Sequence, residues 1–536
     1  MNSSSDFSRR KFLQQSGLVA AACAATPLVS WGDTPTTAAP GTEGEDAAAE
    51  NDLKNLPTLR VLLHAPDGKP LPTARVRTLH ARDLAGDPLP VPISAAEGRA
   101  RIGLAKEPIQ LSCLLDVPGF GEVYCYADNE GQGYTKPGTV DFVVDAALTR
   151  ELRVREAFGA NRGHQHARKE GLPASASPAA HKIPVAYQRL AEGLRLGESV
   201  VMEAAQARIV RFKQPRKDFL FGAPVAGRQL GATFEKHFLE AFNLATISWY
   251  TWKNEKDAEH IDYARMDDSL QWCLDRKLTP KGFGYVYMIN GATPEWFRAW
   301  PYEKILPEYK HIVAQTTKRY GEKLAFVEVI NEAHDKANLF RLSHAQILEL
   351  AREACHAARE GSPTVQRQIN NCCLWAENAK HANADGSRRW SPFRFLADCV
   401  KAGVEFDRIG LQLYYPSQDL LEIDRMLNRF KEFKKPIHIT EISCNSAPGL
   451  DAASMRPKSL VPGWHGPWSE TIQADWVEAI YTLCYSKREF EAVSWWDFAD
   501  YGGHFWPNGG LLHKDLSPKE SFLRLLALQK KWGVSR

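Results

Sequence analysis

The sequence predicts an α/β protein in which a (β/α)8 barrel over residues 218–536 follows a small all-β sandwich domain over residues 57–153. Two observations predict the barrel. Short apolar runs alternate with longer helical stretches after Asp218, and there are eight of these runs, enough to close a barrel. A third observation predicts the sandwich, because the preceding segment reads as short strands separated by turns rich in Gly, Pro and Asp.

The bulk composition excludes several classes of function. Hydrophobic residues make up 44% of the chain and charged residues 24%, so the chain can bury a large core. Lys plus Arg number 67 and Asp plus Glu 64, and a net charge of +3 gives no electrostatic basis for nucleic-acid binding. We expect no membrane-spanning segment, since no apolar run reaches the required length. We also expect the protein to be a monomer.

Cofactor and metal motifs are also missing from the sequence. No Gly-rich phosphate loop follows a predicted strand, and the cysteines after Cys23 include no CxxC spacing, so we expect neither a bound cofactor nor a metal. Cys113 and Cys125 lie in neighbouring strand-like runs and could form a disulfide after export.

Residues 1–32 have the layout of an export signal. Ser8-Arg9-Arg10-Lys11-Phe12-Leu13 precedes the apolar run from Gly17 to Ala25, and the paired arginines predict twin-arginine export to the periplasm or the outside of the cell. The stretch from Ala20 to Cys23 also fits a lipoprotein cleavage site, which would anchor the mature protein through Cys23. Residues 33–56 contain few apolar residues and are predicted to be a disordered linker.

Within residues 57–153 we expect strands at Leu59–Leu63, Ala74–Leu79, Ile109–Leu115, Glu122–Tyr126 and Val140–Val144. Residues 154–217 are predicted to be a connector with helices. They begin with a low-complexity stretch that contains His164, His166 and His181, and a helix is expected at 184–212.

The eight apolar runs after Asp218 are the predicted barrel strands, and the stretches between and after them carry helix-start signals. These are Ser343 with Gln346, Ser391-Pro392 and Ser517-Pro518-Lys519-Glu520. The strands are expected at Phe219–Ala223, Leu244–Trp249, Gly282–Met288, Ala325–Ile330, Gln368–Leu374, Ile409–Tyr414, Ile437–Thr440 and Ala492–Trp496.

Two of these strands end on a carboxylate. Glu332 ends the fourth strand after Asn331, and Glu441 ends the seventh after Thr440. In a barrel the carboxyl ends of all strands meet at one face, so these two groups are expected to face each other across that face. Hydrolysis of a glycosidic bond requires such a pair of carboxyl groups. Glu328 lies mid-strand, four residues before Glu332, and is expected to lie deeper in the barrel.

The same segments carry a resemblance to a known family. Residues 218–536 resemble glycoside hydrolase family 10, the endo-β-1,4-xylanase family, and the similar motifs occur in the family's order. They are Phe242–Thr246, Thr293-Pro294-Glu295-Trp296, Ile409-Gly410-Leu411-Gln412, Pro436–Glu441, Ser494–Phe498 and Gly510–Lys519. The sandwich has no counterpart that we can name, and we consider it a candidate carbohydrate-binding module.

The resemblance implies a retaining glycosidase in which Glu332 is the acid/base and Glu441 the nucleophile. It implies that Asn331 binds the sugar 2-hydroxyl. It further places Gln412 and Trp296 in the substrate site and makes Trp495 or Trp496 an apolar platform, although barrel packing is an equally good interpretation for the two tryptophans.

The sequence departs from the family at several positions. Tyr414 stands where the family has a histidine that contacts the nucleophile, and Asn290 is expected to take the place of another histidine. The Glu-Asn and Lys that hold xylan after the family's second strand are missing, and this sequence has Trp249 and Trp252 in that region.

Three hypotheses therefore stay open. The first is an endo-β-1,4-xylanase-like retaining enzyme. The second is a retaining β-glycosidase for another plant or algal β-glycan, which these departures motivate. The third is a non-catalytic carbohydrate-binding protein.

Overall fold

The computed structural model describes residues 43–160, 182–248, 260–334, 337–376, 379, 383, 388–448, 463–500, 506 and 508–534. The predicted export signal, Cys23 and the three connector histidines lie outside these residues. So do Trp249 and Trp252.

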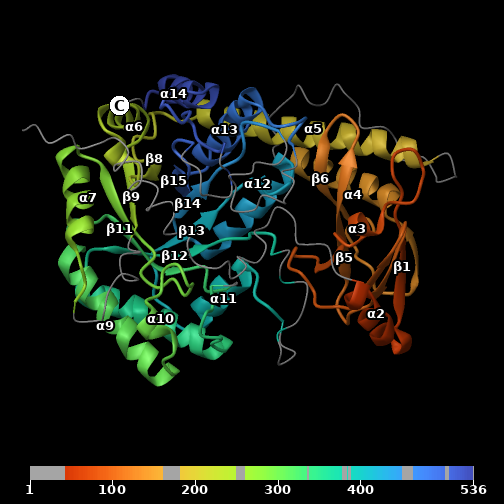
Figure 1. The fold of residues 1–536 in the computed structure, drawn as a ribbon. Coiled ribbons are helices and arrows are strands. Elements are labelled where there is room, and N and C mark those ends of the chain that lie inside the picture. Colours follow the sequence, from red (N-terminus) through yellow and green to blue (C-terminus); the bar gives the residue numbers. More distant parts are fainter. Residues whose placement is uncertain are drawn as a thin grey trace, which may run out of the picture.

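Residues 216 onward form the predicted barrel (Figure 1). Eight parallel strands close into one sheet in the order β10-β11-β12-β13-β14-β15-β8-β9. Their bounds are β8 Leu220–Pro224, β9 Leu244–Ser248, β10 Thr279–Phe283, β11 Phe326–Asn331, β12 Gln366–Asn371, β13 Arg408–Gln412, β14 Ile437–Ile442 and β15 Phe490–Trp495. Every residue of β11 and β14 is buried, as expected for parallel strands covered by helices on the outside and by other strands' side chains inside.

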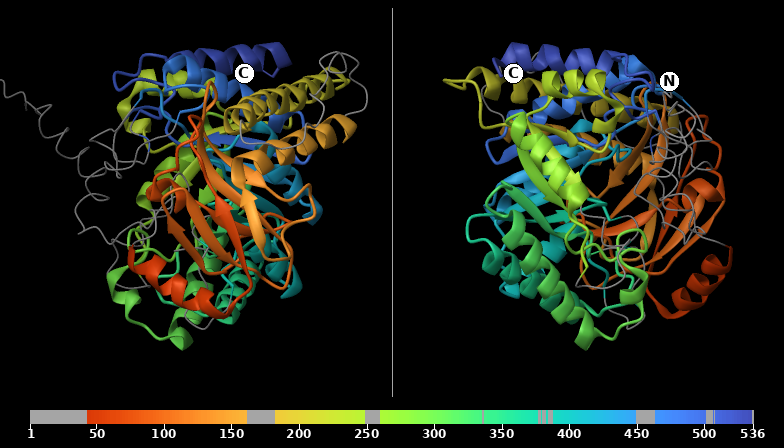
Figure 2. Two further views of the ribbon diagram at one scale, coloured as in Figure 1. Left: turned by 90° about the vertical axis from the view of Figure 1, so that its right-hand side faces the viewer. Right: turned by 60° about the vertical axis from the view of Figure 1, so that its left-hand side comes forward.

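Helices cover the outside of the barrel (Figures 1 and 2). They are α6 Ala232–Ala241, α7 Ala264–Asp275, α8 Glu295–Arg298, α9 Tyr302–Tyr320, α10 His344–Gly361, α11 Pro392–Lys401, α12 Leu420–Phe430, α13 Glu470–Tyr485 and α14 Glu520–Trp532. The predicted capping box is present at α10, where Ser343 and Gln346 bind each other's backbone N–H groups. The start predicted at Ser517-Pro518 is wrong, because α14 begins at Glu520 and the Ser517 hydroxyl binds Asp515 instead.

The third barrel strand begins earlier than its apolar run predicts. β10 starts at Thr279 and ends at Phe283, and Gly284 follows with a left-handed φ of +80°. The backbone then continues beside β11, since the Tyr285 and Val286 amides donate to the carbonyls of Glu328 and Val329. The strand is hard to predict from the sequence because it contains Lys281. A lysine is rarely buried unless an acid such as Glu328 lies beside it.

Residues 58–141 contain two sheets, as the predicted sandwich requires. One has the order β3-β4-β1-β7 and the other β2-β5-β6. The strands are β1 Thr58–Leu62, β2 His80–Asp83, β3 Ile93–Ala96, β4 Arg99–Gly103, β5 Ile109–Val117, β6 Gly121–Ala127 and β7 Gly138–Asp141. Side chains from both sheets share one apolar core, which also takes in residues of two long helices.

Two of the expected strands in this domain are wrong. The run Ala74–Leu79 contains the short helix α3, Thr73–Val76, which starts after Pro72. The run Val140–Val144 is divided between β7, which ends at Asp141, and helix α4, Phe142–Ala160. Apolar runs this short fit either a strand or a buried helix turn, so the pattern alone does not separate them.

The segment predicted as a linker is ordered in its second half. Residues Glu43–Asp52 form helix α2, and Leu53–Asn55 form a turn of 3-10 helix. Asp46 accepts hydrogen bonds from Arg77 and from the Ala95 amide, and Glu50 accepts from Ser94. The acidic residues that made this stretch look disordered are therefore its attachment points.

Helix α5, Lys182–Val210, joins the two parts of the molecule (Figure 2). Its first half contributes Tyr187 and Leu194 to the sandwich core, and its second half contributes Val201 and Ala205 to the barrel core. The predicted boundary between residues 153 and 154 falls inside α4, which packs along α5.

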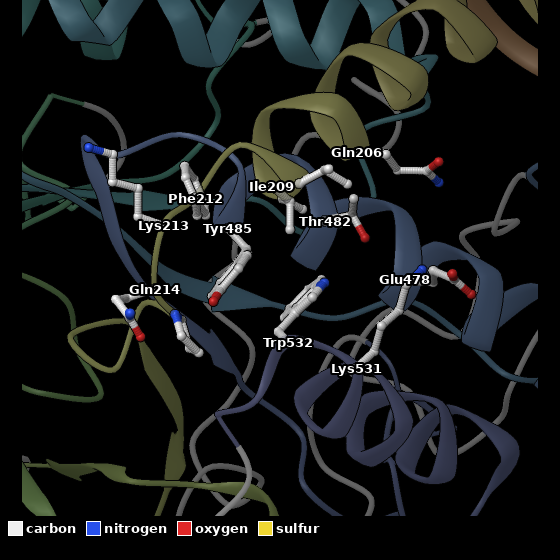
Figure 3. A pocket seen from close by; sticks show the side chains of 12 residues that line it. Gln206, Ile209, Phe212, Lys213, Gln214, Glu478, Thr482, Tyr485, Lys531 and Trp532 are labelled. Atoms are coloured by element: carbon white, nitrogen blue, oxygen red, sulfur yellow. The ribbon is translucent and has the colours of Figure 1, made fainter.

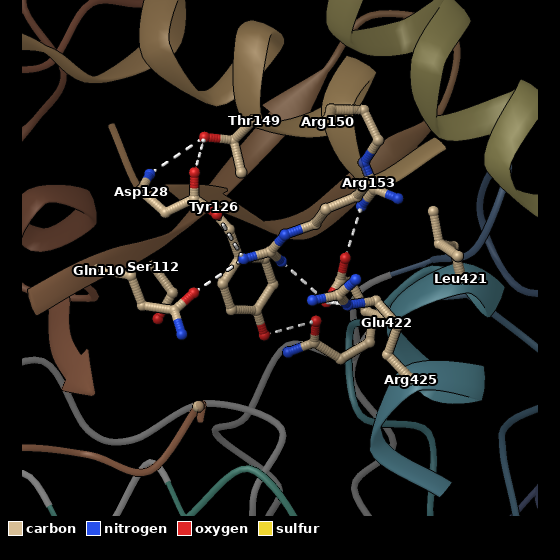
Figure 4. A network of polar contacts seen from close by, with 12 residues as sticks. Gln110, Ser112, Tyr126, Asp128, Thr149, Arg150, Arg153, Leu421, Glu422 and Arg425 are labelled. Carbon is tan, nitrogen blue, oxygen red and sulfur yellow. Dashed lines mark hydrogen bonds and ion pairs between the residues drawn. The ribbon is translucent and has the colours of Figure 1, made fainter. Parts of the chain in front are cut away.

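Buried charges also join the two parts. Arg153 of α4 donates to Gln110 at 2.8 Å and forms ion pairs with Asp128 at 3.2 Å and with Glu422 of α12 at 2.9 Å (Figure 4). Each of these charges has an opposite charge or an amide beside it, which is the condition for burying it without a large loss of stability.

The cysteines of the described residues are free and buried. Cys113 and Cys125 lie directly opposite each other on β5 and β6, and the disulfide considered between them is not formed. Burial raises the pKa of the Cys113 thiol to about 11 and that of Cys125 further, so both remain protonated.

Candidate active site

Glu332 and Glu441 lie at the carboxyl ends of their strands, as predicted. Glu332 directly follows β11, and Glu441 lies near the end of β14. Glu332 has a left-handed φ of +55°, a conformation that costs free energy in residues other than glycine and is often found at functional sites. Its amide donates to the Asn370 carbonyl at 3.0 Å, which ties this turn to β12.

Glu441 is 5% exposed and accepts two hydrogen bonds. The Tyr414 hydroxyl donates to one carboxylate oxygen at 2.7 Å, and the Asn370 side-chain amide donates to the other at 3.1 Å. The orientation of Asn370 follows from Thr440, whose hydroxyl donates to the side-chain oxygen of Asn370 at 2.5 Å. That bond leaves the NH2 group of Asn370 facing the carboxylate.

Asn370 also links the two strand ends. Its NH2 group donates to the Asn331 side-chain oxygen at 2.9 Å. The NH2 group of Asn331 is itself buried and has no hydrogen-bond partner among the residues that the structure describes. A buried amide without a partner is costly, so this group is available to a ligand oxygen that would take the place of a protein partner.

Glu332 is half-buried and has its own two donors. The Gln412 side-chain amide donates to one oxygen at 2.6 Å, and the Tyr287 hydroxyl lies 3.0 Å from the other. Gln412 and Tyr414 lie at the end of β13 and just beyond it, so one segment contacts both carboxyl groups.

Burial raises the pKa of Glu441 well above its ordinary value, and the charges of Glu332 and Glu328 add to this effect. The hydrogen bond from Tyr414 and the charge of Lys281 act in the opposite direction. Two close carboxyl groups do not both ionise readily, so the pair is expected to share one proton near neutral pH. Burial and Glu441 raise the pKa of Tyr414, which therefore stays protonated and able to donate.

Glu328 lies below the two carboxyl groups, as its mid-strand position predicts. It is fully buried, and its carboxylate is 2.5 Å from the Lys281 ammonium of β10, which is buried as well. Burial raises the pKa of Glu328, and the charge of Lys281 lowers it. Both side chains of this ion pair are withdrawn from solvent, which is typical of a structural pair.

Of the two predicted tryptophan platforms, Trp496 is partly buried and Trp495 is fully buried. The Trp496 ring lies 5.1 Å from that of Phe283, which in turn lies 6.3 Å from Tyr287. The indole N–H of Trp495 donates to the Gly509 carbonyl at 2.8 Å. The structure therefore connects Trp496 with the carboxyl groups, whereas Trp495 packs inside the barrel.

The other two predicted binding residues lie on the segment after β10. The Asn290 carbonyl accepts a hydrogen bond from Arg298 at 2.6 Å. The Trp296 ring contacts Phe297 and Trp300 in an aromatic cluster. Neither contact involves Glu332 or Glu441, so the assignment of Asn290 and Trp296 to the substrate site stays a prediction.

Tyr287 and Asn370 belong to the site, but they were not predicted as members. Asn370 had a detectable signal, because Gln368, Asn370 and Asn371 interrupt a buried strand with amide side chains. Buried amides need hydrogen-bond partners, so such a strand indicates a polar network inside the barrel. Tyr287 offered no comparable signal, since tyrosine is common in buried strands.

A separate pocket of about 370 Å³ lies at the opposite end of the barrel (Figure 3). It lies among the carboxyl ends of α5, α13 and α14, and the rings of Tyr485 and Trp532 stack within it at 4.2 Å. The carboxyl ends of barrel helices lie beside the amino ends of the strands, so this pocket is remote from Glu332 and Glu441.

No group of three or more His, Cys, Asp or Glu side chains among the described residues is arranged to hold a metal ion. No helix in the described part of the chain has the length and apolar character needed to cross a membrane.

The barrel part of the chain is similar to known proteins. Residues 216–526 match the sequence family described as Glycosyl hydrolase family 10. An "Endo-1,4-beta-xylanase/feruloyl esterase" of Xylanibacter ruminicola is 24% identical over 157 residues, which are 28% of this chain and 20% of the relative. The chain therefore matches only about a fifth of that relative's length.

Solved structures also align with the chain. Native xylanase 10B of Thermotoga maritima aligns at 18% identity and a TM-score of 0.47, over 59% of this chain and 97% of that one. A xylanase of Paenibacillus barcinonensis aligns at 18% identity and a TM-score of 0.45, over 59% of this chain and 98% of that one.

Proposed function

The chain belongs to glycoside hydrolase family 10, and we propose that it cleaves a β-1,4-linked polysaccharide, xylan in the first instance, with retention of configuration. One observation carries the proposal. Glu332 follows β11 and Glu441 lies near the end of β14, and Asn370 contacts both residues, since its carbonyl accepts from the Glu332 amide and its NH2 group donates to the Glu441 carboxylate. Such a pair of carboxyl groups is the machinery for glycoside hydrolysis.

In the proposed reaction Glu441 attacks the anomeric carbon, and Glu332 gives its proton to the departing glycosidic oxygen. Glu332 then takes a proton from water, which displaces Glu441 from the glycosyl-enzyme. A retaining mechanism requires the two carboxyl groups to be about 5–5.5 Å apart. The donors on Glu441, Tyr414 and Asn370, stabilise the carboxylate that attacks.

The substrate site is proposed to use the groups around these two acids. The unpartnered NH2 group of Asn331 would donate to the sugar 2-hydroxyl, an interaction that strengthens as the anomeric carbon becomes cationic. Trp496 would provide the apolar platform, since sugar rings have apolar faces that stack on aromatic rings. Gln412 would line the same subsite beside Glu332.

A second candidate is a retaining β-glycosidase for another β-linked glycan. Tyr287 and Tyr414 contact the two carboxyl groups, and Tyr414 stands where the family resemblance leads us to expect a histidine. An enzyme for a sugar other than xylose would keep the two catalytic acids and change the side chains around them, and Tyr414 is such a change here.

A hydrolysis screen of the purified protein tests the proposal. The substrates are xylan, mixed-linkage glucan, galactan and aryl β-glycosides, and Glu441→Ala and Glu332→Ala are assayed beside the wild type. Glu322→Ala, which changes an exposed glutamate of the same barrel, is the matched control and should keep full activity.

The outcomes of the screen separate the candidates. Xylan hydrolysis that disappears in Glu441→Ala supports the proposal. Hydrolysis of another glycan that disappears in the same variant supports the second candidate. A wild type that binds a glycan but cleaves none would indicate a carbohydrate-binding protein.

Two measurements test retention. In NMR of the reaction, the first product should carry the β-configuration, and an α-product would contradict a nucleophilic Glu441. Azide should restore turnover of an activated aryl glycoside in both variants, since a small anion can replace either missing carboxylate. The glycosyl azide should be retained with Glu332→Ala and inverted with Glu441→Ala.

We also propose that residues 1–32 direct twin-arginine export. Replacement of Arg9 and Arg10 by lysine should keep the protein in the cytoplasm, and cell fractionation measures this. If Cys23 is lipidated, Cys23→Ala should release an otherwise membrane-bound protein into the soluble fraction.

A further inference from the structure

The segment that follows Tyr414 is held by more than the barrel. The N-terminal domain, which here means the sandwich together with helices α4 and α5 (residues 43–160 and 182–210), also contacts it. Ser417, Gln418 and Asp419 are all fully buried, although the segment joins a strand end to helix α12. Ser417 has a left-handed φ of +53°. A serine keeps this conformation only where its surroundings enforce it.

The first contacts come from strand β6. The Tyr124 amide donates to the Ser417 carbonyl at 2.9 Å, so the backbone of one domain binds the backbone of the other. Two residues on, the Tyr126 hydroxyl donates to the Gln418 side-chain oxygen at 3.1 Å. In Figure 4, Tyr126 and the two arginines of α4 come together over α12.

The second contact comes from helix α4. The Arg150 guanidinium forms two parallel bonds with the Asp419 carboxylate, at 3.0 and 2.5 Å, and both side chains are buried. Asp419 is also the N-cap of α12, since it accepts a hydrogen bond from the Leu421 amide. A buried two-bond pair of this kind fixes the orientation of both partners.

The third contact comes from helix α5. The Glu198 carboxylate accepts from the Leu420 amide and from the Trp464 indole, each at 3.1 Å, and lies 2.6 Å from His465. Trp464 and His465 lie on the segment after β14, the strand that carries Glu441. One carboxylate of the N-terminal half thus joins the segments after β13 and β14.

The segment after β12 is held in the same way. Arg82 of β2 donates to the Trp375 carbonyl at 2.6 Å, and Arg388 forms an ion pair with Asp83 at 2.8 Å. The N-terminal domain therefore contacts three consecutive segments at the carboxyl end of the barrel, the end that carries the two acids.

The barrel itself fixes the other side of Tyr414. The Leu413 amide donates to the Glu441 carbonyl at 2.7 Å, and the Tyr415 amide donates to the Ser443 carbonyl at 3.1 Å. Tyr414 thus lies between β14 and the segment that the N-terminal domain holds. A shift of Ser417–Asp419 would move the Tyr414 hydroxyl relative to Glu441.

We propose that the N-terminal domain is a fixed part of the active site, in which Tyr126 and Arg150 are positioning residues that hold Ser417–Asp419 and, through it, Tyr414 against Glu441. The proposal rests on the proposed function, because it assigns Glu441 the role of nucleophile. It gives the sandwich a role in the reaction that does not require it to bind carbohydrate.

The test uses point variants of the full chain. Tyr126→Phe removes only the hydroxyl that binds Gln418, and Arg150→Lys keeps the charge while it loses the two-bond geometry. The matched control is Arg189→Met. Arg189 pairs with buried Glu151 and so joins α5 to α4, but it does not contact the barrel segment.

The proposal predicts a loss in kcat rather than in KM. Tyr126→Phe should lower kcat on an aryl β-glycoside a few-fold and Arg150→Lys about tenfold, with KM within about twofold, because misplacement of a catalytic group mainly affects the transition state. The acidic limb of the kcat/KM profile should move to higher pH in both, since the Tyr414 hydrogen bond lowers the pKa of Glu441. Arg189→Met should leave the limb in place.

A double-mutant cycle makes the test specific. If Tyr126 acts through Tyr414, adding Tyr126→Phe to Tyr414→Phe should cause no further loss of kcat. An equal loss in both backgrounds would overturn the proposal. So would a wild-type pH profile in Tyr126→Phe and Arg150→Lys.

Hydrogen exchange separates failure of this proposal from failure of the proposed function. Amides of residues 413–415 and 417–420 should exchange faster in Tyr126→Phe and Arg150→Lys than in Arg189→Met. Faster exchange in a protein that cleaves no glycan would reject the proposed function but support the role of the N-terminal domain in holding Ser417–Asp419. Unchanged exchange would reject that role, even if the protein cleaves xylan.

Discussion

The N-terminal domain and the barrel both bury charged and amide side chains, but they use them differently. In the N-terminal domain, Arg150 and Arg153 meet carboxylates of α12. In the barrel, Asn331 keeps an unpartnered NH2 group among the described residues, and the pKa of Glu441 is raised. The first arrangement joins two parts of a chain, and the second is suited to a ligand and to proton transfer.

The difference shows that burial of a polar residue does not by itself identify an active site. A buried charge with a complete set of partners indicates structure, whereas an unpartnered amide beside two competing carboxyl groups indicates chemistry. Variants on the two sides should therefore separate stability from turnover.

The largest effect is expected from Arg150→Met. The change leaves the Asp419 carboxylate buried without its partner, and breaking such a pair costs about 3–5 kcal/mol of the free energy of unfolding. Urea unfolding measures this loss, with the exposed Arg60→Met as a control that should stay within about 0.5 kcal/mol of the wild type. A loss below about 1 kcal/mol would mean that the pair does not hold the two parts together.

The second effect depends on pH and belongs to the barrel. Burial lowers the pKa of His438 from 6.5 to about 4, beside Glu491 and Arg408. The unfolded chain therefore binds a proton at His438 below pH 6.5 that the folded chain does not bind until about pH 4. The contribution of His438 to the free energy of unfolding is therefore fully present above pH 6.5. It is lost as the pH falls toward 4, by about 3 kcal/mol in total.

A comparison with His438→Asn isolates this contribution. The difference in melting temperature between the two proteins should shrink as the pH falls from 6.5 to 4. A difference that is the same at every pH would show that His438 titrates alike in both states.

The third effect concerns Asn331→Ala and should appear in turnover. If the Asn331 amide binds the 2-hydroxyl, kcat/KM on an aryl β-glycoside should fall about 100-fold, or about 2.7 kcal/mol. Stability should change little, because the lost bond to Asn370 is a single one. The matched control is the 2-deoxy substrate, for which wild type and variant should react at similar rates. A persisting 100-fold gap would place the role of Asn331 elsewhere.

The smallest effect is expected from Tyr414→Phe. Loss of one hydrogen bond to Glu441 should lower kcat about tenfold, and because that bond lowers the pKa of Glu441, the acidic limb of the pH profile should move to higher pH. A profile measured between pH 4 and 8 tests the sign, and a shift to lower pH would contradict the donor role of Tyr414.

The two regions also differ in how well the sequence predicts them. Each of the eight barrel strands overlaps a predicted apolar run, although β10 shares only Gly282 and Phe283 with its run, and the ends of two runs predict where Glu332 and Glu441 lie. Each of these inferences uses a local pattern in a fold whose geometry brings strand ends together.

The sequence predicts the N-terminal domain less well than the barrel. Ala74–Leu79 and Val140–Val144 read as strands, but helix α3 lies within the first run and helix α4 begins within the second. The pairing of Arg150 with Asp419 joins residues 269 positions apart and leaves no local signal at either. Asn370 could have been found from the amides of its strand, whereas the contact between Tyr126 and Gln418 required the structure.

Helix α5 has a consequence for how the molecule unfolds. Its 29 residues contribute to the apolar cores of both halves without a break. Melting of either half would therefore expose apolar surface on a helix that the other half still needs. The two halves should therefore absorb heat and lose ellipticity together, in one calorimetric transition. A multidomain chain whose parts are connected by a flexible tether would instead show separate transitions.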